Sequence, residues 1–307
     1  MNAKYYGVDV SKDHLDVACE DRVERIENSK AGIRKFIKRL PEGSVVGMEA
    51  TNTYHLLLAD LCYSSGMRVY VVNPRVTRHY RVVRGLRGHT DRMDALTLSS
   101  FIEAEHAKQR PYEPLSTDQR KLRTLIKRRS KLVTAKVQIE QSMRGVKDVA
   151  RELKAVLERM EKLIEKTQML IDALLDSNDD RSRITTIPGV GTVVSAVLVA
   201  DLDCCDFRSA DAFVAFYGLD PRPNDSGRSR GRRKLSKQGQ KLGRTQLYNA
   251  AMSASITTAW HGIYMACLDR GLSKVQALIV IARKIARAAW SIYTHKTTFN
   301  AERLSCA

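Results

Sequence analysis

One long stretch without proline constrains the fold of this chain most. Residues 116–177 contain no proline and a single glycine, Gly145. Their apolar residues recur at alternating spacings of three and four, which is typical of a coiled coil or a long helical hairpin. A lone helix of this length could not bury its seam, so we expect pairing with a second copy of the chain. The alternative is a hairpin that packs on its own chain and breaks near Gly145. The seam consists of Leu122, Leu125, Leu132, Ile139, Met143, Val146, Ala150, Leu153, Leu157, Met160, Ile164, Ile171 and Leu174, with Arg129, Lys136 and Thr167 interrupting it.

This helical stretch divides the chain into three parts. With 307 residues the chain is long enough for two domains and a spacer. We expect an N-terminal domain over residues 1–112, a helical spacer over 113–180 and a mainly α-helical C-terminal domain over 181–307.

The first part alternates strand and helix patterns. Three consecutive strands joined by short turns indicate an antiparallel meander, and the alternation of helix and strand that follows favours a mixed α/β sheet covered by helices. The expected elements are strands over 4–10, 14–19, 22–27, 44–50 and 67–72, helices over 31–40 and 52–65, a short helix after Pro74, and a helix that opens at Thr90 or Asp91.

Four carboxylates stand at positions where a cation site can form. Asp9 and Glu49 lie near the ends of apolar strands, where an acid is costly unless it is paired or binds metal. Asp91 and Asp94 are three residues apart, so both leave one face of the helix that they open. Hard cations such as Mg²⁺ prefer oxygen ligands, and four acids together favour such a site. Taken singly, each acid also fits a strand-end cap or a salt bridge with an arginine.

The charge balance points to a polyanionic partner. The chain has 52 Lys and Arg against 34 Asp and Glu, a formal net charge of +18, which makes nucleic acid the first candidate and an acidic membrane surface the second. No apolar run is long enough to span a bilayer, and the N-terminus lacks the parts of a signal peptide. The six cysteines form no C-x-x-C pair, which argues against a zinc site and favours reduced thiols in a cytoplasmic protein.

The C-terminal part contains a glycine turn and two apolar helices. Residues 185–201, with Pro-Gly-Val-Gly at their centre, look like a helix-hairpin-helix element. Gly189 and Gly191 would let the backbone approach a phosphate at the start of the next helix, although such a turn also occurs without one. Residues 213–219 are apolar and expected in the core. Helices are expected over 247–258 and 273–294, the second with a solvated basic side made by Arg283, Lys284 and Arg287.

A strongly basic segment lies between these elements. Residues 221–244 carry nine basic residues against one acid, Asp225, which indicates a phosphate-binding loop. Because the segment is internal, we interpret it as a site loop rather than as a tail. The basic residues are Arg222, Arg228, Arg230, Arg232, Arg233, Lys234, Lys237, Lys241 and Arg244.

Several motifs together resemble one family. Gly-Val-Asp-Val-Ser-Lys (7–12), Met-Glu-Ala-Thr-Asn-Thr-Tyr (48–54), Val-Val-Asn-Pro (71–74) and Thr-Asp-Arg-Met-Asp-Ala (90–95) resemble the RuvC-like DEDD domain of the insertion-sequence 110 transposases, recombinases related to the Piv DNA invertases. The resemblance implies a ribonuclease-H-like fold for the N-terminal domain. It also implies a Mg²⁺ site whose four metal-binding acids are Asp9, Glu49, Asp91 and Asp94.

The basic segment resembles the same family's transposase domain. Pro-x-x-x-x-Ser-Gly followed by Ser-Lys-x-Gly maps the family's nucleophile onto Ser226. Chemistry alone leaves Ser229 and Ser236 open, because any serine hydroxyl is a weak nucleophile until a base or metal activates it. Arginine side chains around it would stabilise the charge that develops on phosphorus.

The resemblance implies a site-specific DNA recombinase that moves its own element through a covalent phosphoserine link. A structured bridge RNA would choose the target by base pairing, and the active assembly would be a homo-oligomer, a dimer or a tetramer in the synaptic complex. Three alternatives stay open: a metal-only junction nuclease, a guide-free Piv-like invertase and a non-catalytic nucleic-acid-binding protein. The expected nucleic-acid-binding residues are Gly189, Gly191, Arg228, Arg230, Arg232, Arg233, Lys234 and Lys237.

Overall fold

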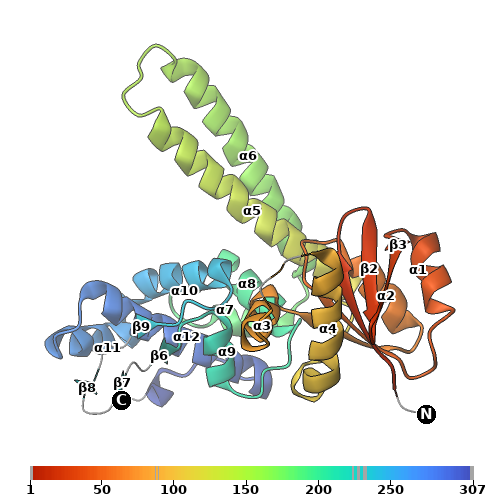
Figure 1. Cartoon of the computed structure of the whole chain (residues 1–307). Coiled ribbons are helices and arrows are strands. Elements are labelled where there is room, and N and C mark those ends of the chain that lie inside the picture. The colour runs from red at the N-terminus through yellow and green to blue at the C-terminus, as the bar shows by residue number, and fades with distance from the viewer. Residues whose placement is uncertain are drawn as a thin grey trace. The chain divides into compact units, whose positions relative to one another are not determined.

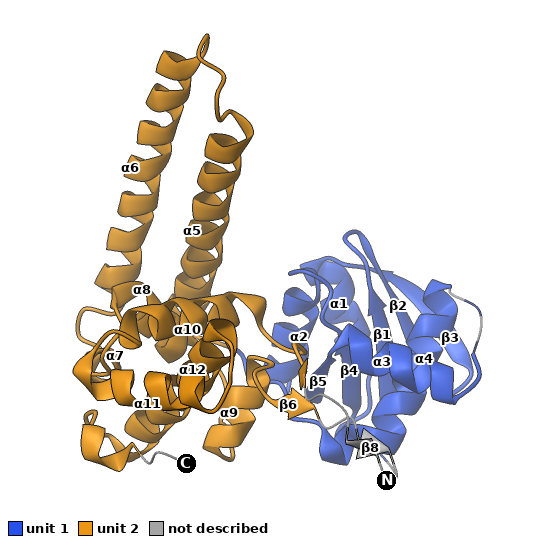
Figure 2. Ribbon diagram, turned by 90° about the vertical axis from the view of Figure 1, so that its left-hand side faces the viewer, with its two compact units in different colours: residues 1–114 blue, residues 115–307 orange. Residues whose placement is uncertain are grey.

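The computed structural model of the chain divides into two compact units, residues 1–114 and 115–307 (Figure 2). The structure describes residues 3–86, 88, 90–222, 225, 226, 229, 230 and 234–304, and for residues 225, 226, 229 and 230 only the backbone. Nearly all of the expected spacer, 113–180, belongs to the second unit.

The first unit is built on a five-stranded mixed sheet in the order β3-β2-β1-β4-β5. β2 is antiparallel to both β1 and β3, whereas β4 is parallel to both β1 and β5. The mixed α/β prediction is confirmed, and each expected strand agrees within one residue at either end. The strands are β1 (Tyr5–Val10), β2 (His14–Cys19), β3 (Arg22–Glu27), β4 (Val45–Glu49) and β5 (Arg68–Val72).

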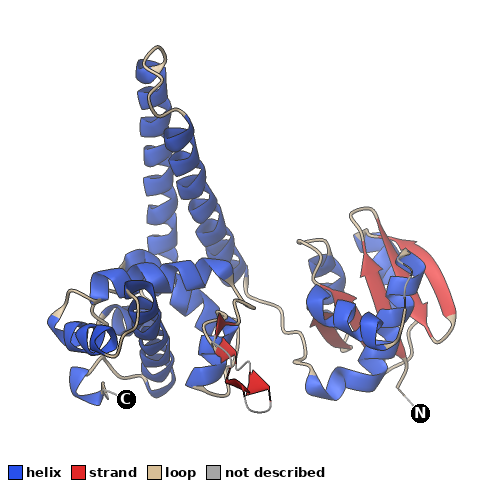
Figure 3. Cartoon of the chain, turned by 60° about the vertical axis from the view of Figure 1, so that its left-hand side comes forward, coloured by secondary structure: helices blue, strands red, loops and turns tan. Residues whose placement is uncertain are grey.

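Helices cover both faces of this sheet (Figure 3). On one face, α1 (Lys30–Ile37) and α2 (His55–Ser64) bury their apolar side chains against the strands. On the other face lies α4 (Asp91–Glu105), which packs against α3 (Pro74–Val83) and is followed by the short η1 (His106–Lys108). Alternate side chains of each strand therefore face different helices.

The long heptad stretch forms an antiparallel hairpin within the second unit. α5 (Thr117–Ser142) and α6 (Ala150–Leu174) lie side by side (Figure 1) and are linked by the Lys136–Glu161 ion pair. Gly145 has a φ of +90° in the turn between them, a conformation that favours glycine. The expectation that this seam needs a second copy is therefore wrong, because the seam pairs within its own chain.

The rest of the second unit is a helical bundle around a buried core that includes Tyr217, Trp260 and Ile281. The helix expected over 247–258 is confirmed as far as Ala254, but its expected end is wrong. One helix ends at Ala254 and the next begins at Thr258, and at the break the side chains of Ser255 and Thr257 donate to backbone carbonyls. The helices are α7 (Asp179–Thr185), α8 (Thr192–Leu202), α9 (Ala210–Phe216), α10 (Lys241–Ala254), α11 (Thr258–Asp269), α12 (Lys274–His295) and η2 (Ala301–Arg303).

The basic segment carries four two-residue strands. They are β6 (Pro221–Arg222), β7 (Asp225–Ser226), β8 (Ser229–Arg230) and β9 (Lys234–Leu235), and β6 pairs with β9 while β7 pairs with β8. None of the described helices combines the length and the apolar character that a membrane span requires.

Candidate active site

Two glycines allow α4 to lie directly on the sheet. A Cβ at Gly7 would lie 2.7 Å from the carbonyl carbon of Leu98 and closer still to other α4 backbone atoms. A Cβ at Gly47 would lie 2.6 Å from the Cδ1 atom of Ile102. Gly7 and Gly47 are register partners in the parallel β1–β4 pair, so the helix crosses both strands at one level. Because Gly7 and Gly47 have no side chains, α4 can pack directly on β1 and β4, and its first residues lie close to the ends of these strands.

The predicted strand acids follow these glycines by two residues. Because side chains alternate along a strand, Asp9 and Glu49 lie on the same face as Gly7 and Gly47, which is the face that α4 covers. On the other side of Asp9, the antiparallel register places Asp16 of β2 directly opposite. Three carboxylates thus lie in one row across the sheet.

The N-terminus of α4 adds a fourth carboxylate. The Thr90 side chain accepts a hydrogen bond from the Met93 backbone N–H, so Thr90 is the N-cap and Asp91 is the first helical residue. Burial, together with the charges of Asp91, Glu49 and Asp16, raises the pKa of the Asp9 carboxyl from its ordinary value to about 6. Burial is the largest cause of this rise in pKa, and the three neighbouring carboxylates add to it.

The Arg25 guanidinium neutralises part of this cluster, and His14 lies beside it. The Arg25 guanidinium of β3 donates to Asp16 at 2.8 and 3.0 Å and to Asp91 at 3.1 Å, while His14 Nε2 lies 3.9 Å from Asp16 and 4.0 Å from Asp91. His14, Asp16 and Asp91 each offer a ligand atom within 4.8 Å of the others, close enough to share a metal ion.

The remaining predicted acids have other partners. The buried Arg81 of α3 forms an ion pair with Asp94, and the Thr77 hydroxyl donates to Glu49. The sheet register therefore places Asp9, Glu49 and Asp16 in one row, and Asp94 is held against Arg81 one turn further along α4 than Asp91. Of the four predicted acids, only Asp91 belongs to the described group whose ligand atoms all lie within 4.8 Å of one another. Carboxylates gathered in this way suit a hard divalent cation, with oxygen ligands of the kind that Mg²⁺ takes.

The base of the basic segment is clamped by specific contacts. The Ser236 hydroxyl donates to Asp220, and Arg244 Nη1 donates to the carbonyl oxygen of Tyr217 at 2.8 Å and to that of Lys237 at 3.4 Å. Gly218, with a φ of +65°, could not accept a Cβ without meeting Lys237. The two ends of the segment are thus held side by side.

The predicted nucleophile lies on this clamped segment. Ser226 is in β7, whose backbone pairs with β8, but its side chain lies outside the described residues, as do those of Ser229 and Arg230. Arg228, Arg232 and Arg233 lie wholly outside them. Lys234 in β9 is exposed, and Lys237 has a φ of +50° in the turn that closes the segment.

Two family models match the chain. A model of the DEDD transposase domain of the IS110 type, described as "Transposase", matches residues 6–150, and one described as "Transposase IS116/IS110/IS902 family" matches residues 181–265. Together they cover both the acid-bearing unit and the serine segment. The chain belongs to the IS116/IS110/IS902 transposase family.

Several related proteins align with most of the length of this transposase. A "Probable family 20 transposase" of Pseudomonas aeruginosa is 25% identical over 97% of this chain and 99% of its own. The "Transposase for insertion sequence element IS1328" of Yersinia enterocolitica is also 25% identical, over 97% and 99%. The "Pilin gene-inverting protein" of Moraxella bovis is 28% identical over 82% of this chain and 81% of its own. The mixed sheet fits the ribonuclease-H-like fold that a DEDD domain implies.

The glycine turn of the transposase has a packing role. α7 and α8 flank the turn, as the helix-hairpin-helix interpretation requires. Gly189 has a φ of +91°, and a Cβ there would lie 2.7 Å from Ala254 of α10, whereas one at Gly191 would meet nothing within 4 Å. Only Gly191, at the open start of α8, leaves room for a ligand, and the phosphate role of both glycines stays a prediction.

Sequence reasoning missed Asp16 and Arg25 of the transposase. Asp16 is 6% exposed within an apolar strand, the same signal that identified Asp9. Asp9 and Asp16 are partners in the hairpin formed by the predicted strands 4–10 and 14–19. Asp16 and Arg25 are partners in the hairpin that follows. A register argument could therefore have found both residues.

Proposed function

We propose that this transposase cuts and rejoins DNA through Ser226, with a Mg²⁺ ion held by Asp9, Glu49, Asp91 and Asp94 and with a bridge RNA choosing the target. The proposed metal site is supported by the sheet register, which places Asp9 and Glu49 side by side on the face covered by α4, the helix that begins at Asp91. When bound, Mg²⁺ supplies positive charge for the phosphoryl oxygens of the scissile strand.

The chain's own residues have separate tasks in this proposal. Ser226 Oγ bonds to a backbone phosphorus, one P–O bond of the strand breaks, and the hydroxyl proton leaves with the departing oxygen. Basic side chains of the 221–244 segment bind the phosphates. Arg25 and Arg81 neutralise Asp91 and Asp94, so they share these carboxylates with any bound cation and keep the acids positioned.

The clamp at the base of the segment supports Ser226 over Ser236. The Ser236 hydroxyl donates to Asp220 and accepts from the Gln238 backbone N–H, so it already serves to close the segment. Ser226 is in the part of the segment enclosed by this clamp.

The decisive experiment compares Ser226→Ala and Asp94→Asn with Ser229→Ala. Each of the first two should reduce recombination by at least about 1,000-fold while DNA affinity stays within about twofold. The covalent protein–DNA adduct on a denaturing gel should be absent for Ser226→Ala and present for Ser229→Ala. Full strand cleavage by Ser226→Ala would instead establish a metal-only nuclease, and unchanged function in both variants a non-catalytic protein.

A second candidate, a guide-free invertase, is favoured by the two pilin gene-inverting relatives from Moraxella. Sequencing the RNA that co-purifies with the protein separates the candidates. A defined structured RNA required for recombination supports the bridge-RNA proposal, and recombination by RNA-free protein supports the invertase.

We also propose that the protein forms a homo-oligomer. The heptad seam does not supply the contact, because it packs between α5 and α6 of the same chain. Val156, Leu163 and Leu170 recur every seven residues along α6, and each is between 44 and 49% exposed. This second apolar stripe supports contact with another copy. Leu163→Glu should reduce the sedimentation coefficient of the assembly and leave the helical content unchanged.

A further inference from the structure

A buried carboxylate lies in the last turn of α8, in the second unit. Asp201 is 2% exposed, and no step of the proposed reaction uses it. A charge is costly to bury unless it is paired and hydrogen-bonded, and the dipole of a helix disfavours an acid at its C-terminal end. Burial accordingly raises the pKa of the Asp201 carboxyl, against the lowering effects of Arg123, Tyr217 and Gln240. Side chains with shifted pKa values are concentrated at functional sites.

Three donors from three parts of the chain converge on Asp201. The Tyr217 hydroxyl donates to Oδ2 at 3.1 Å, and the Gln240 side-chain amide donates to Oδ1 at 3.0 Å. Arg123 Nη1 of α5 lies 3.3 Å from Oδ1 and supplies the opposite charge. Tyr217 precedes the basic segment, and Gln240 follows Ser226 as the N-cap of α10. The carboxylate thus holds a residue on each side of the predicted nucleophile.

The position of Arg123 fixes the orientation of the Gln240 amide. A guanidinium only donates, so the Asp201 Oδ1 atom that faces Arg123 is an acceptor, and Gln240 must present its nitrogen there. The Gln240 side-chain oxygen then accepts from the Gly243 backbone N–H at 3.2 Å, in the first turn of α10. The Gln240 backbone N–H donates to the Phe216 carbonyl oxygen at 3.0 Å. The start of α10 is therefore tied both to α8 and to the residues that precede the basic segment.

Tyr217 is tied to α10 by packing and by a second hydrogen bond. Its side chain is fully buried, and a Cβ at Gly243 would lie 2.7 Å from the Tyr217 Cδ1 atom. Arg244 Nη1 donates to the Tyr217 carbonyl oxygen at 2.8 Å. A shift of Tyr217 would therefore move the base of the basic segment, and a misplacement of about 1 Å can cost about 100-fold in rate.

We propose that Asp201 is a positioning residue for strand cleavage, because it holds Tyr217 and Gln240 and so fixes both ends of the stretch that carries Ser226. The inference rests on the proposed function, which assigns strand cleavage to this segment. It adds a buried residue that acts through the backbone of the segment.

The test separates the rate of cleavage from the affinity for DNA. Asp201→Ala removes the acceptor from Tyr217 and Gln240, so single-turnover strand cleavage at saturating DNA should slow about tenfold or more, while DNA affinity stays within about twofold. Asp201→Asn keeps an acceptor for Gln240 and should restore the rate to within about threefold of the wild type. Gln240→Ala leaves the core of α8 unchanged and should slow cleavage about fivefold, which provides a second, milder variant.

Asp203→Ala is the matched control. The Asp203 carboxylate accepts from the Tyr293 hydroxyl at 2.8 Å, so its bond joins the end of α8 to α12 rather than to the basic segment. The control loses the same kind of hydrogen bond and should keep both the cleavage rate and the DNA affinity within about twofold of the wild type.

Hydrogen exchange tests the anchoring directly, whichever group attacks the DNA. Peptides over residues 234–242 contain the Gln240 amide, which donates to the Phe216 carbonyl oxygen. In Asp201→Ala, exchange in these peptides should be about tenfold faster than in the wild type.

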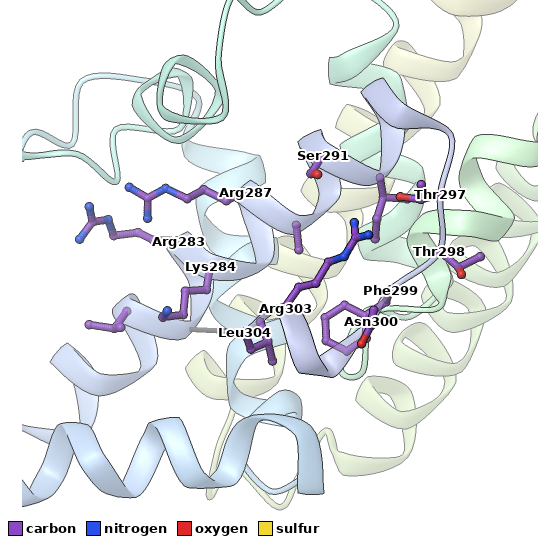
Figure 4. Close-up of a pocket in the computed structure, with 13 residues that line it drawn as sticks. Arg283, Lys284, Arg287, Ser291, Thr297, Thr298, Phe299, Asn300, Arg303 and Leu304 are labelled. Carbon is purple, nitrogen blue, oxygen red and sulfur yellow. The ribbon is translucent and has the colours of Figure 1, made fainter. Parts of the chain in front are cut away.

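α12 is the reference for this measurement. One side of the helix is buried in the core, and the other is partly exposed, where Arg283, Lys284 and Arg287 line a cavity of about 580 Å³ (Figure 4). Exchange in peptides over residues 278–292 reports on the stability of the second unit, and it should stay within about twofold in every variant.

Wild-type cleavage by Asp201→Ala, an equal loss in Asp203→Ala, or unchanged exchange over residues 234–242 would overturn the proposal. A loss of DNA affinity that accounts for the loss of rate would overturn it as well. Cleavage that is lost in Asp201→Ala and kept in Ser226→Ala would refute the serine mechanism and support the positioning role. The reverse result would refute the positioning role alone.

Discussion

Replacing Gly7 by alanine tests how closely α4 must approach the sheet. The added Cβ would lie 2.7 Å from the Leu98 carbonyl carbon and nearer still to the Ser99 nitrogen, whereas ordinary contact begins at 3.4 Å. Because these are backbone atoms, no side chain can move aside, and α4 would have to shift by roughly 1 Å. We expect a cost at the upper end for overpacking, about 3 kcal/mol of the free energy of unfolding of the first unit.

The same shift should impair the reaction. Asp91 is on α4 and Asp9 on β1, so a displacement of roughly 1 Å between them should lower recombination about 100-fold, even at temperatures where the protein stays folded. The Ser99 hydroxyl also donates to the Tyr5 carbonyl at 3.0 Å, a contact that ties the helix to the strand and would be weakened.

The assay can separate the two units. Both tryptophans, Trp260 and Trp290, are in the second unit, so fluorescence during urea unfolding reports on that unit alone. Hydrogen exchange of peptides from β1 and β4 reports on the first unit. Gly7→Ala should speed exchange in the first unit and leave the fluorescence transition unchanged.

The matched control is Gly262→Ala in α11, where a Cβ would meet nothing within 4 Å. This change should leave the first unit unaffected and stabilise the second by about 0.5–1 kcal/mol. If Gly7→Ala keeps wild-type exchange and wild-type recombination, the close approach of α4 does not position the acids, and the reasoning fails.

Three further predictions concern stability and reactivity. Burial raises the pKa of Cys62 to about 12, so the thiol stays neutral at pH 8 and iodoacetamide should label it only after unfolding; rapid labelling of the native chain would contradict its burial. Tyr217→Phe removes a buried hydrogen bond of 3.1 Å to the Asp201 carboxylate and should lower the urea-unfolding free energy of the second unit by about 2 kcal/mol, whereas an unchanged midpoint would mean that the bond adds nothing. Gly189→Ala should destabilise that unit by about 2 kcal/mol or more because of its positive φ and its contact with α10, while Gly191→Ala should have little effect on thermal unfolding; equal effects would rule out the packing role.

Local patterns in the chain determined the elements of the first unit. Short apolar runs, some alternating and some continuous, predicted all five strands, because the burial of one or both faces of a strand is reflected in its own residues. The N-cap at Thr90 and the helix after Ser273 were likewise predictable, since a cap depends on residues three positions apart. Where two helices met at Ser255 and Thr257 the pattern failed, because hydroxyl-bearing residues fit either a helix or its end.

Only the tertiary structure decided what each pattern pairs with. The heptad seam is the same for a coiled coil between chains and for a hairpin within one, and the turn at Gly145 selects the hairpin. Likewise, Asp9 of β1 and Glu49 of β4 could each be predicted from their own strand. The row that they form with Asp16 depends on the order and register of the strands. The period of the apolar residues indicates which face of a helix or strand is buried. Which element packs against that face is decided by contacts between residues far apart along the chain.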